Sequence, residues 1–332
     1  MASIKQKTVS FADVQARVQA IIDTENTYAV SSPTLETLGR VADIDNYSDF
    51  GLKSLGKMVG FPADFLRSLA ETGSKPLANR NIVDRVLNYF KTTNNEPRRP
   101  FYAREFNDKI CGVVSDKYAY FDDDEVMDII GGSPLADFQF QYAGVSPERL
   151  HLRAIDLDNP FKIEGDKSDL YMLYFVDNSM VGQASFKVRI GIYRQVCSNG
   201  LIIPMKDFVL CKAVHRGNRD IAAQFNQSVE FFKEKRDEIQ AILTTSAEEE
   251  ASIEQLRQKF DEDYVKTYVA KKLNTNKSET EKIIVLFDRY SIEYGRASKW
   301  AFTNAVTEFA RDLPESQLER RLYLESKALA AA

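Results

Sequence analysis

The chain has 332 residues, of which 44% are hydrophobic and 11% aromatic, so the composition excludes an intrinsically disordered protein. Its three cysteines, Cys111, Cys197 and Cys211, are too few and too scattered for a disulfide framework. The N-terminus lacks the apolar core of a signal peptide, and no window approaches the roughly 18 apolar residues of a membrane span. We therefore expect a soluble cytoplasmic protein that does not enter the membrane.

The formal net charge of −5 is unevenly distributed along the chain. Residues 181–221 contain seven basic and two acidic side chains, whereas residues 121–170 contain four basic and twelve acidic ones. A chain segregated in this way can present a basic surface although its total charge is acidic.

The first part of the chain has the pattern of helices. The segment "SFADVQARVQAIID" starts at a capping serine, "PADFLRSLAE" opens with proline in the first turn, and "NRNIVDRVLNYFK" repeats apolar residues at helical spacing. These patterns predict an N-terminal helical segment over residues 1–95.

From Pro100 to about Val214, short aromatic and β-branched runs alternate with turn residues, which predicts an antiparallel sheet core over residues 96–219. Inside it, "YFDDDEVMDIIGG" has the acidic start and glycine end of a helix. The run "SFKVRIGIYRQV" alternates, so its even-numbered apolar residues share one face and its lysine and first arginine share the other.

After Asp220 the pattern is helical again, and residues 220–332 are predicted to form a long C-terminal helical region. The predicted fold class is α+β: a central antiparallel sheet with an N-terminal helical layer and the C-terminal helices. The three segments could also form one domain.

Three segments carry a family resemblance: "VVSDKYAYFDDDEVMDII", "VDNSMVGQASFKVRIGIYRQVCSNGLIIP" with the following "VHRGN", and "SKWAFTNAVTEFA". In order and spacing they resemble the phage/plasmid-like protein family, domain of unknown function 932, over roughly residues 60 to 330. The resemblance implies a phage, prophage or plasmid origin and a bacterial host, and it implies no biochemical activity. The residues that match the family pattern are Tyr118, Asn178, Ser179, Gly182, Cys197, Asn199, His215 and Asn304.

The stretch "GIYRQVCSNGLIIP" allows two interpretations. A catalytic Cys197 would need a base to form its thiolate, and His215 is the nearest histidine along the chain. A small buried hydrophobe at the end of a strand is the commoner role for cysteine. Because Asn199 and Gly200 tolerate positive φ, the stretch is also typical of a β-hairpin, with the turn at residues 198–200.

The sequence predicts neither a metal site nor a cofactor. Cys211 and His215 lie four residues apart in a strand pattern, which separates them by about 13 Å, and zinc needs further ligands. The acidic run at residues 122–125 lacks the spacing of a calcium loop. Phosphate-binding glycine loops and serine-hydrolase motifs do not occur, so no catalytic residue is assigned.

Charge and aromatic residues favour nucleic-acid binding. The segment "NNEPRRPFYAREF" sets arginines among aromatic rings, and proteins that bind single strands combine such cations with rings that stack on bases. The opposing interpretation is that strand aromatics fill the core and strand arginines form a solvated face. We predict binding of single-stranded nucleic acid, to protect or anneal it, through Arg98, Arg99, Phe101, Tyr102, Arg104, Lys187, Arg189, Arg194, Lys212 and Arg216.

Two other functions fit the sequence. In one, the protein is a non-enzymatic interaction protein whose long C-terminal helices form a homo-oligomer. In the other, it is an enzyme that depends on Cys197. The nucleic-acid prediction requires that basic side chains from distant segments gather on one surface, and Arg194 reaches that surface only if its strand bulges or ends there.

Overall fold

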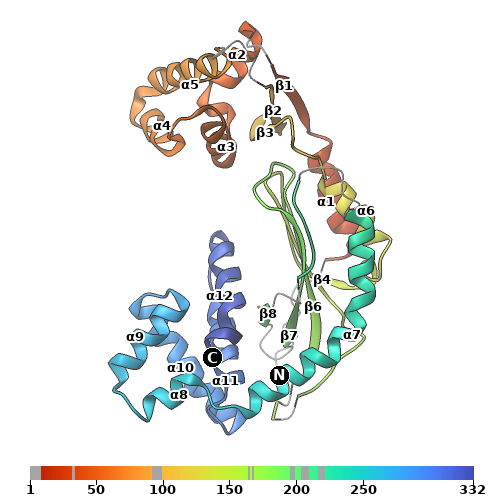
Figure 1. Cartoon of the computed structure of the whole chain (residues 1–332), viewed down its shortest axis with the longest axis vertical. Coiled ribbons are helices and arrows are strands. Elements are labelled where there is room, and N and C mark those ends of the chain that lie inside the picture. The colour runs from red at the N-terminus through yellow and green to blue at the C-terminus, as the bar shows by residue number, and fades with distance from the viewer. Residues whose placement is uncertain are drawn as a thin grey trace.

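The computed structural model describes residues 9–31, 34–91, 99–163, 165–166, 168–194, 199–202, 209–215 and 221–332. In Figure 1 they form a C-shaped molecule, with an N-terminal lobe at one end, an antiparallel sheet in the middle and a group of C-terminal helices at the other end. This arrangement confirms the predicted α+β class with its helical C-terminal region.

The N-terminal lobe packs helices against a small antiparallel sheet with the strand order β1-β2-β3. Its core joins Leu55 and Ile82 from two helices to Phe101 from the sheet. The elements of this part are β1 (Asn26–Val30), α2 (Leu35–Ala42), α3 (Asp49–Val59), α4 (Ala63–Leu69), α5 (Lys75–Phe90), β2 (Phe101–Phe106) and β3 (Lys109–Ser115). The first helix, α1 (Phe11–Ile22), packs instead on the central part of the molecule, through Val14 and Val18.

This lobe differs from the sequence prediction in two ways. Strand β1 lies inside the segment predicted to be helical. It pairs with β2, which pairs with β3, and the three strands form a sheet of their own. The single sheet predicted over residues 96–219 is therefore wrong: it is two sheets. The reason is that β1 has only five residues and its partner strand lies some seventy residues further on, a pairing that local pattern does not reveal.

The central sheet has the antiparallel order β4-β5-β6-β7-β8, and β9 also pairs with β7. Its elements, with the helix that precedes it, are α6 (Asp123–Gly131), β4 (Gln139–Ser146), β5 (Arg149–Ile155), β6 (Leu170–Asn178), β7 (Phe186–Arg194), β8 (Asn199–Ile202) and β9 (Val209–Ala213). The predicted helix over the acidic run is confirmed as α6. The predicted hairpin is confirmed as the β7–β8 pair, but Asn199 and Gly200 lie in β8, paired with Arg194 and Tyr193, so the connection itself falls on residues 195–198, outside the described residues.

The two faces of the central sheet are covered differently. Phe186, Val188, Ile190 and Ile192 of β7 are buried on one face, as the alternation predicted, whereas Lys187 and Arg189 are only partly buried on the other. The long helix α7 (Ile221–Glu248) packs on the first face, and α12 (Leu318–Ala331) covers part of the second. Figure 1 shows that the second face looks into the opening of the C.

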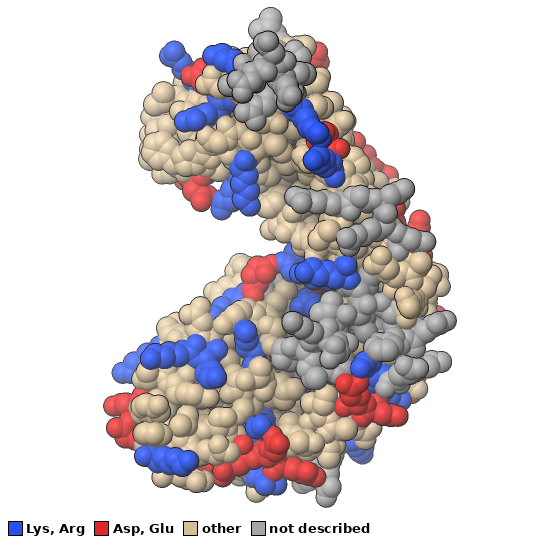
Figure 2. Space-filling model, in the orientation of Figure 1, with Lys and Arg blue, Asp and Glu red and all other residues tan. Residues whose placement is uncertain are grey.

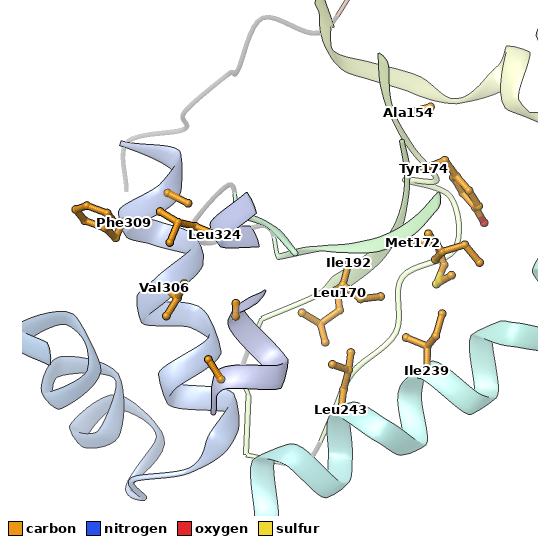
Figure 3. Packing of buried hydrophobic residues seen from close by; sticks show 14 of the residues in the cluster. Ala154, Leu170, Met172, Tyr174, Ile192, Ile239, Leu243, Val306, Phe309 and Leu324 are labelled. Carbon is orange, nitrogen blue, oxygen red and sulfur yellow. The ribbon is translucent and has the colours of Figure 1, made fainter. Parts of the chain in front are cut away.

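The core continues from the sheet into the C-terminal helices. Figure 3 shows Ile239 and Leu243 of α7 pointing toward Leu170 and Met172 of β6. The same cluster extends to α11 and α12, where Val306 and Leu324 are buried. The remaining helices are α8 (Ser252–Arg257), α9 (Glu262–Leu273), α10 (Lys277–Tyr294) and α11 (Lys299–Arg311).

None of the helices in the described ranges combines the length and the hydropathy that crossing a bilayer requires.

Candidate nucleic-acid interface

Two adjoining cavities open on the concave side of the molecule. The larger, of about 490 Å³, lies between the N-terminal lobe and the loop that joins β6 to β7, and we call it the junction cavity. The smaller, of about 240 Å³, lies between the exposed face of the sheet and α12. Both are lined by Ala184 and Ser185, so they adjoin at these residues, and we call the two together the hollow. Figure 2 shows this side hollowed, with Lys and Arg side chains on both flanks.

The lining of the hollow is predominantly basic. The junction cavity has two lysines and no carboxylate among its described lining residues, and the smaller cavity has three basic and two acidic side chains. The basic residues are Lys57, Lys117, Arg149, Lys187 and Arg189, and the acidic ones are Asp177 and Glu319. Parts of the sequence that lie far apart, α3, β5 and β7, therefore bring cations to one surface.

Lys187 and Lys212 face each other across the β7–β9 pair, next to this hollow. Neither ammonium group forms an ion pair with a carboxylate in the described part of the chain. Burial, followed by the charges of Lys212 and Arg189, lowers the pKa of Lys187. Like charges directly opposite each other destabilise a sheet, and Asp177, which lies opposite Lys187 across the β6–β7 pair, offsets part of this repulsion.

Asp177 organises the other basic groups on this face. It accepts hydrogen bonds from Arg149 at 3.2 Å and from His151 at 2.7 Å, and Arg189 forms an ion pair with its other oxygen. Burial alone would raise the pKa of Asp177, but His151 and the two arginines outweigh burial and lower it. Arg189, which the sequence predicted to contact phosphate, is thus partly neutralised, although it still lines the cavity.

Of the aromatic and basic residues predicted from the segment 98–104, those that the structure describes do not line this hollow. Phe101 has no exposed surface and packs against Phe90 in the lobe core, so its ring cannot stack on a base, and that part of the prediction is wrong. Arg99 is 64% exposed and paired with Asp116. Tyr102 is partly buried on β2, and Arg98 lies outside the described residues.

Arg104 cannot make the predicted phosphate contact either, because its guanidinium is completely buried. It donates two hydrogen bonds to the Asp122 carboxylate, at 2.6 and 2.7 Å, pairs with Glu25, and donates to the carbonyl of Met180 at 2.5 Å. Burial lowers the pKa of Arg104, but the two carboxylates outweigh it and hold the pKa above its usual value. Arg104 therefore ties the N-terminal lobe to the central sheet.

Arg194 has a similar structural role at the other end of the sheet. The strand neither bulges nor ends early, so Arg194 stays on the apolar face, where it binds both oxygens of Asp166 at 2.7 and 2.9 Å. Trp300 Nε1 of α11 donates to the same carboxylate at 2.9 Å. This prediction of a phosphate contact is wrong because parity along a regular strand decides which face a side chain takes. Arg216 lies outside the described residues.

Four of the family-pattern residues meet at the wall of the junction cavity. The rings of Tyr118 and His215 stack with centroids 5.0 Å apart and an interplanar angle of 10°. The Tyr118 hydroxyl donates to the carbonyls of Ser179 and Met180. Gly182 has a φ of 81°, which favours glycine, and a Cβ there would lie 3.3 Å from the Tyr118 ring.

The other family-pattern residues have different positions. Asn178 donates to Asp123 and to the carbonyl of Phe121, and Asn304 of α11 donates to the carbonyl of Trp300. Asn199 lies in β8, and Cys197 falls outside the described residues.

The family pattern described as a domain of unknown function (DUF932) matches residues 110–316, which include the central sheet, the helices from α7 to α11 and every side of the junction cavity except α3. The chain belongs to this family. Comparisons with curated proteins and with solved structures gave no match. The Tyr118 and His215 pair, the Asn178 contact and the Arg194 to Trp300 network all lie inside the matched segment of this DUF932 chain, and Lys57 lies outside it.

Sequence reasoning missed several residues of the site in this DUF932 chain. Lys57 and Lys117 lie in segments without a basic cluster, and Asp166 and Asp177 carry no motif. Their roles depend on strand register and on the approach of the lobe to the sheet, which no local signal reports.

Cys111 is a buried cysteine. Burial raises the pKa of its thiol to about 11, so the thiol stays protonated at neutral pH.

Proposed function

We propose that the concave basic surface of this DUF932 protein binds single-stranded nucleic acid, as a DNA-metabolism protein of a phage or another mobile element. The observation that carries the proposal is the unneutralised pair Lys187 and Lys212. A polyanion that lies over the pair would relieve its repulsion, and each phosphate contact would release counterions from the strand.

The basic residues of the hollow form a path along which a strand could run. From the lobe to the sheet, this path contains Lys57, Lys117, Lys212, Lys187, Arg189 and Arg149. It retains three of the residues predicted from the sequence, Lys187, Arg189 and Lys212, and it replaces the segment 98–104 by residues from α3 and from the end of β3. Tyr323 of α12, 36% exposed, lines the smaller cavity and offers a ring on which a base could stack.

The mobile-element role rests on the family resemblance of the three motif segments. The family pattern assigns no activity, so the role in protecting or annealing strands belongs to the same proposal. Both activities need a protein that holds the phosphate backbone with little regard to sequence, which a row of lysines provides.

The test is the binding of a fluorescently labelled oligothymidylate, followed by anisotropy over a range of salt concentrations. For single strands each lost phosphate contact reduces the slope of log affinity against log salt by about 0.7, so Lys187→Ala with Lys212→Ala should flatten it by about 1.4. The matched control is Lys271→Ala with Lys282→Ala, two exposed lysines of α9 and α10. The control should bind like the unmodified protein. Absence of binding, or binding that does not respond to salt, would overturn the proposal.

Lys187→Ala with Lys212→Ala should not lower the stability of the protein. Removal of two like charges that face each other relieves repulsion, so the variant should unfold at a denaturant concentration no lower than that of the unmodified protein. A loss of binding then cannot be ascribed to a loss of folding.

A self-assembling interaction protein is the alternative, and exposed apolar side chains favour it. Ile292 and Val285 lie seven residues apart on one face of α10 and are 83% and 67% exposed. Light scattering with and without the oligonucleotide separates the two functions. A fixed oligomer that binds no oligonucleotide supports the alternative, whereas binding by a monomer or by an oligomer that changes size supports the proposal.

A further inference from the structure

Helix α10 has one face that no other element in the described part of the chain covers. Ile283 and Phe287, on the opposite side of the helix, are buried in the main core. On the uncovered side, the residues at three-to-four spacing from 278 to 292 are all exposed, and two of them, Val285 and Ile292, are apolar. Figure 1 shows α10 among the C-terminal helices, at the end of the C away from the N-terminal lobe. Single exposed apolar side chains are ordinary, so the charges around this pair must identify its partner.

The charged residues on either side of Val285 are segregated by sign. Because successive residues of an α-helix are about 100° apart, Glu281 and Asp288 lie about 40° and 60° to one side of Val285. Lys282 and Arg289 lie about 60° and 40° to the other side. We call this surface the α10 face: an apolar centre between an acidic and a basic flank, whose charges lie at the same two levels along the helix.

The charges of the two flanks are only partly used within the chain. Lys282 forms no ion pair with a described carboxylate, and Glu281 has only a pair of 4.0 Å with Lys266. Asp288 and Arg289 each pair with one residue, on α8 and α11 respectively, but both side chains remain about half exposed. Each flank can therefore take a further partner of opposite charge.

Two copies of the α10 face complement each other in one of two symmetric orientations. With the two helices parallel and a two-fold axis running along them, the acidic flank of each copy meets the basic flank of the other. With the helices antiparallel and the axis across them, acidic meets acidic and basic meets basic, so like charges repel. In the parallel orientation Val285 and Ile292 each lie against the same residue of the second copy.

We propose that two copies of the chain associate through the α10 face, with their α10 helices parallel about a two-fold axis. Glu281 pairs with Lys282 of the second copy, and Asp288 pairs with Arg289 of the second copy. Symmetry makes each of these contacts occur twice, and the two apolar centres are removed from water between them.

This interface goes beyond the proposed function and does not rest on it. None of the described residues that line the hollow lies on α10, so the contact between copies uses none of its cations. Lys282 therefore remains suitable as a control position for oligonucleotide binding. The dimer has two basic hollows, one in each copy.

Sedimentation velocity of the full chain over a range of concentrations tests the inference. The unmodified protein should convert from monomer to dimer as its concentration rises. Val285→Ala with Ile292→Ala should raise the dissociation constant of the dimer at least about tenfold, because it removes most of the apolar contact. Alanine is the best helix former, so this variant should keep α10 folded. Leu77→Ala, at an exposed leucine of α5, is the matched control and should dimerise like the unmodified protein.

Charge reversals test the orientation of the two helices. Glu281→Lys and Lys282→Glu, each alone, place like charges opposite each other twice in the dimer, and each should raise its dissociation constant about tenfold. The two reversals together restore opposite charges and should restore the dimer. Arg80→Glu, which reverses an exposed charge of α5, is the control and should have no effect. Added salt should shrink the effects of the single reversals.

A protein that stays monomeric at every concentration would overturn the inference, and so would a dimer that Val285→Ala with Ile292→Ala leaves unchanged. Single reversals without effect, or a double reversal that does not restore the dimer, would overturn the parallel arrangement and with it the proposal. If the protein binds the oligonucleotide only as a monomer, the interface fails and the proposed function stands. If the dimer shows the expected variant effects and binds no oligonucleotide, the proposed function fails and the interface stands.

Discussion

Asp123, at the start of α6, accepts a hydrogen bond of 2.8 Å from the side-chain amide of Asn178, at the end of β6. Both residues are fully buried. The second carboxylate oxygen of Asp123, Oδ2, and the amide oxygen of Asn178, Oδ1, make no hydrogen bond in the described part of the chain. Burial raises the pKa of Asp123 to about 7, more than the Asn178 hydrogen bond lowers it. A family-pattern asparagine thus contacts a carboxyl group that titrates near neutrality.

Asp123→Asn is the first prediction. In the unfolded chain the carboxyl group of Asp123 has its ordinary pKa of 3.8. Between about pH 4 and pH 7 the folded state therefore keeps a proton on Asp123 that the unfolded state has lost. Its contribution to stability is fully present below the lower value and is lost as pH rises through the higher one. Relative to Asp123→Asn, the unmodified protein should lose about 1.4 kcal/mol of unfolding free energy per pH unit in this window, and no more above about pH 8.

Urea unfolding followed by circular dichroism at several pH values measures this difference. Asp124→Asn is the control, since Asp124 is the adjacent residue and only partly buried, so its difference from the unmodified protein should change less with pH than that of Asp123→Asn. A constant difference between the unmodified protein and Asp123→Asn from about pH 5 to pH 8 would contradict a raised pKa.

The sequence predicts those features of the fold that depend on local pattern. The alternation in β7 correctly assigned Phe186 and Val188 to the buried face and Lys187 to the other face, because strand parity follows from backbone geometry alone. The acidic start of α6 and the helical spacing of α7 also predicted these two helices correctly. Strand β1 could not be predicted, because its five residues have no clear period and only their pairing with the distant strand β2 identifies them.

The candidate site was less predictable, because charge counts do not show which cations are neutralised. Arg104, Arg189 and Arg194 looked equivalent to Lys187 in the sequence, yet each of the three is paired with a buried or partly buried carboxylate. Arginine suits such pairs through its planar fork, whereas the lysines kept their charges exposed. Composition cannot make this distinction, and only the folded structure separates lysines without an ion pair from arginines that hold elements together.

Arg104→Ala is predicted to destabilise the protein strongly. The variant leaves Asp122 and Glu25 close together without the guanidinium that neutralises them, and truncation of one partner of a buried pair costs about 3–5 kcal/mol. Arg104→Lys should recover only part of this loss, because lysine cannot bind both Asp122 oxygens in the same planar geometry. Urea unfolding at constant pH measures both variants.

Arg99→Ala is the matched control for this experiment. Arg99 is an exposed arginine of the same segment whose ion pair with Asp116 faces solvent, and such pairs contribute little. If Arg104→Ala and Arg99→Ala unfolded at the same urea concentration, the role of Arg104 in joining the lobe to the sheet would be wrong.

The Asp166 network gives a third prediction. Trp300→Phe removes one hydrogen bond to a charged acceptor and should cost about 1.5–3 kcal/mol. Asp166→Ala removes the carboxylate that Arg194 binds through two hydrogen bonds and should cost more, about 3–5 kcal/mol. Glu293→Ala is the control, since its side chain is half exposed and its bond to Arg194 is peripheral. In thermal unfolding, Asp166→Ala should lower the melting temperature most, Trp300→Phe less and Glu293→Ala least. An effect of Glu293→Ala equal to that of Asp166→Ala would contradict this prediction.

His215→Phe tests what the buried histidine contributes to the fold. Burial lowers the pKa of His215 by more than the backbone hydrogen bonds with Ala119 and Ala184 and the charge of Asp122 raise it. The unfolded chain therefore binds the proton first, near pH 6.5, and the stability of the unmodified protein should fall as pH drops below that value. His215→Phe lacks this loss. His151 is present in both proteins, so its own lowered pKa cancels in the comparison.

At neutral pH the expected result is more informative. The Phe variant keeps a ring beside Tyr118 but removes the nitrogens that interact with the backbone of Ala119 and Ala184, so it should lose about 0.5–1.5 kcal/mol of unfolding free energy for each hydrogen bond. Parallel urea titrations at about pH 7.5 and pH 5.5 measure both effects. A Phe variant that is as stable as the unmodified protein at neutral pH would mean that the His215 nitrogens do not serve the fold.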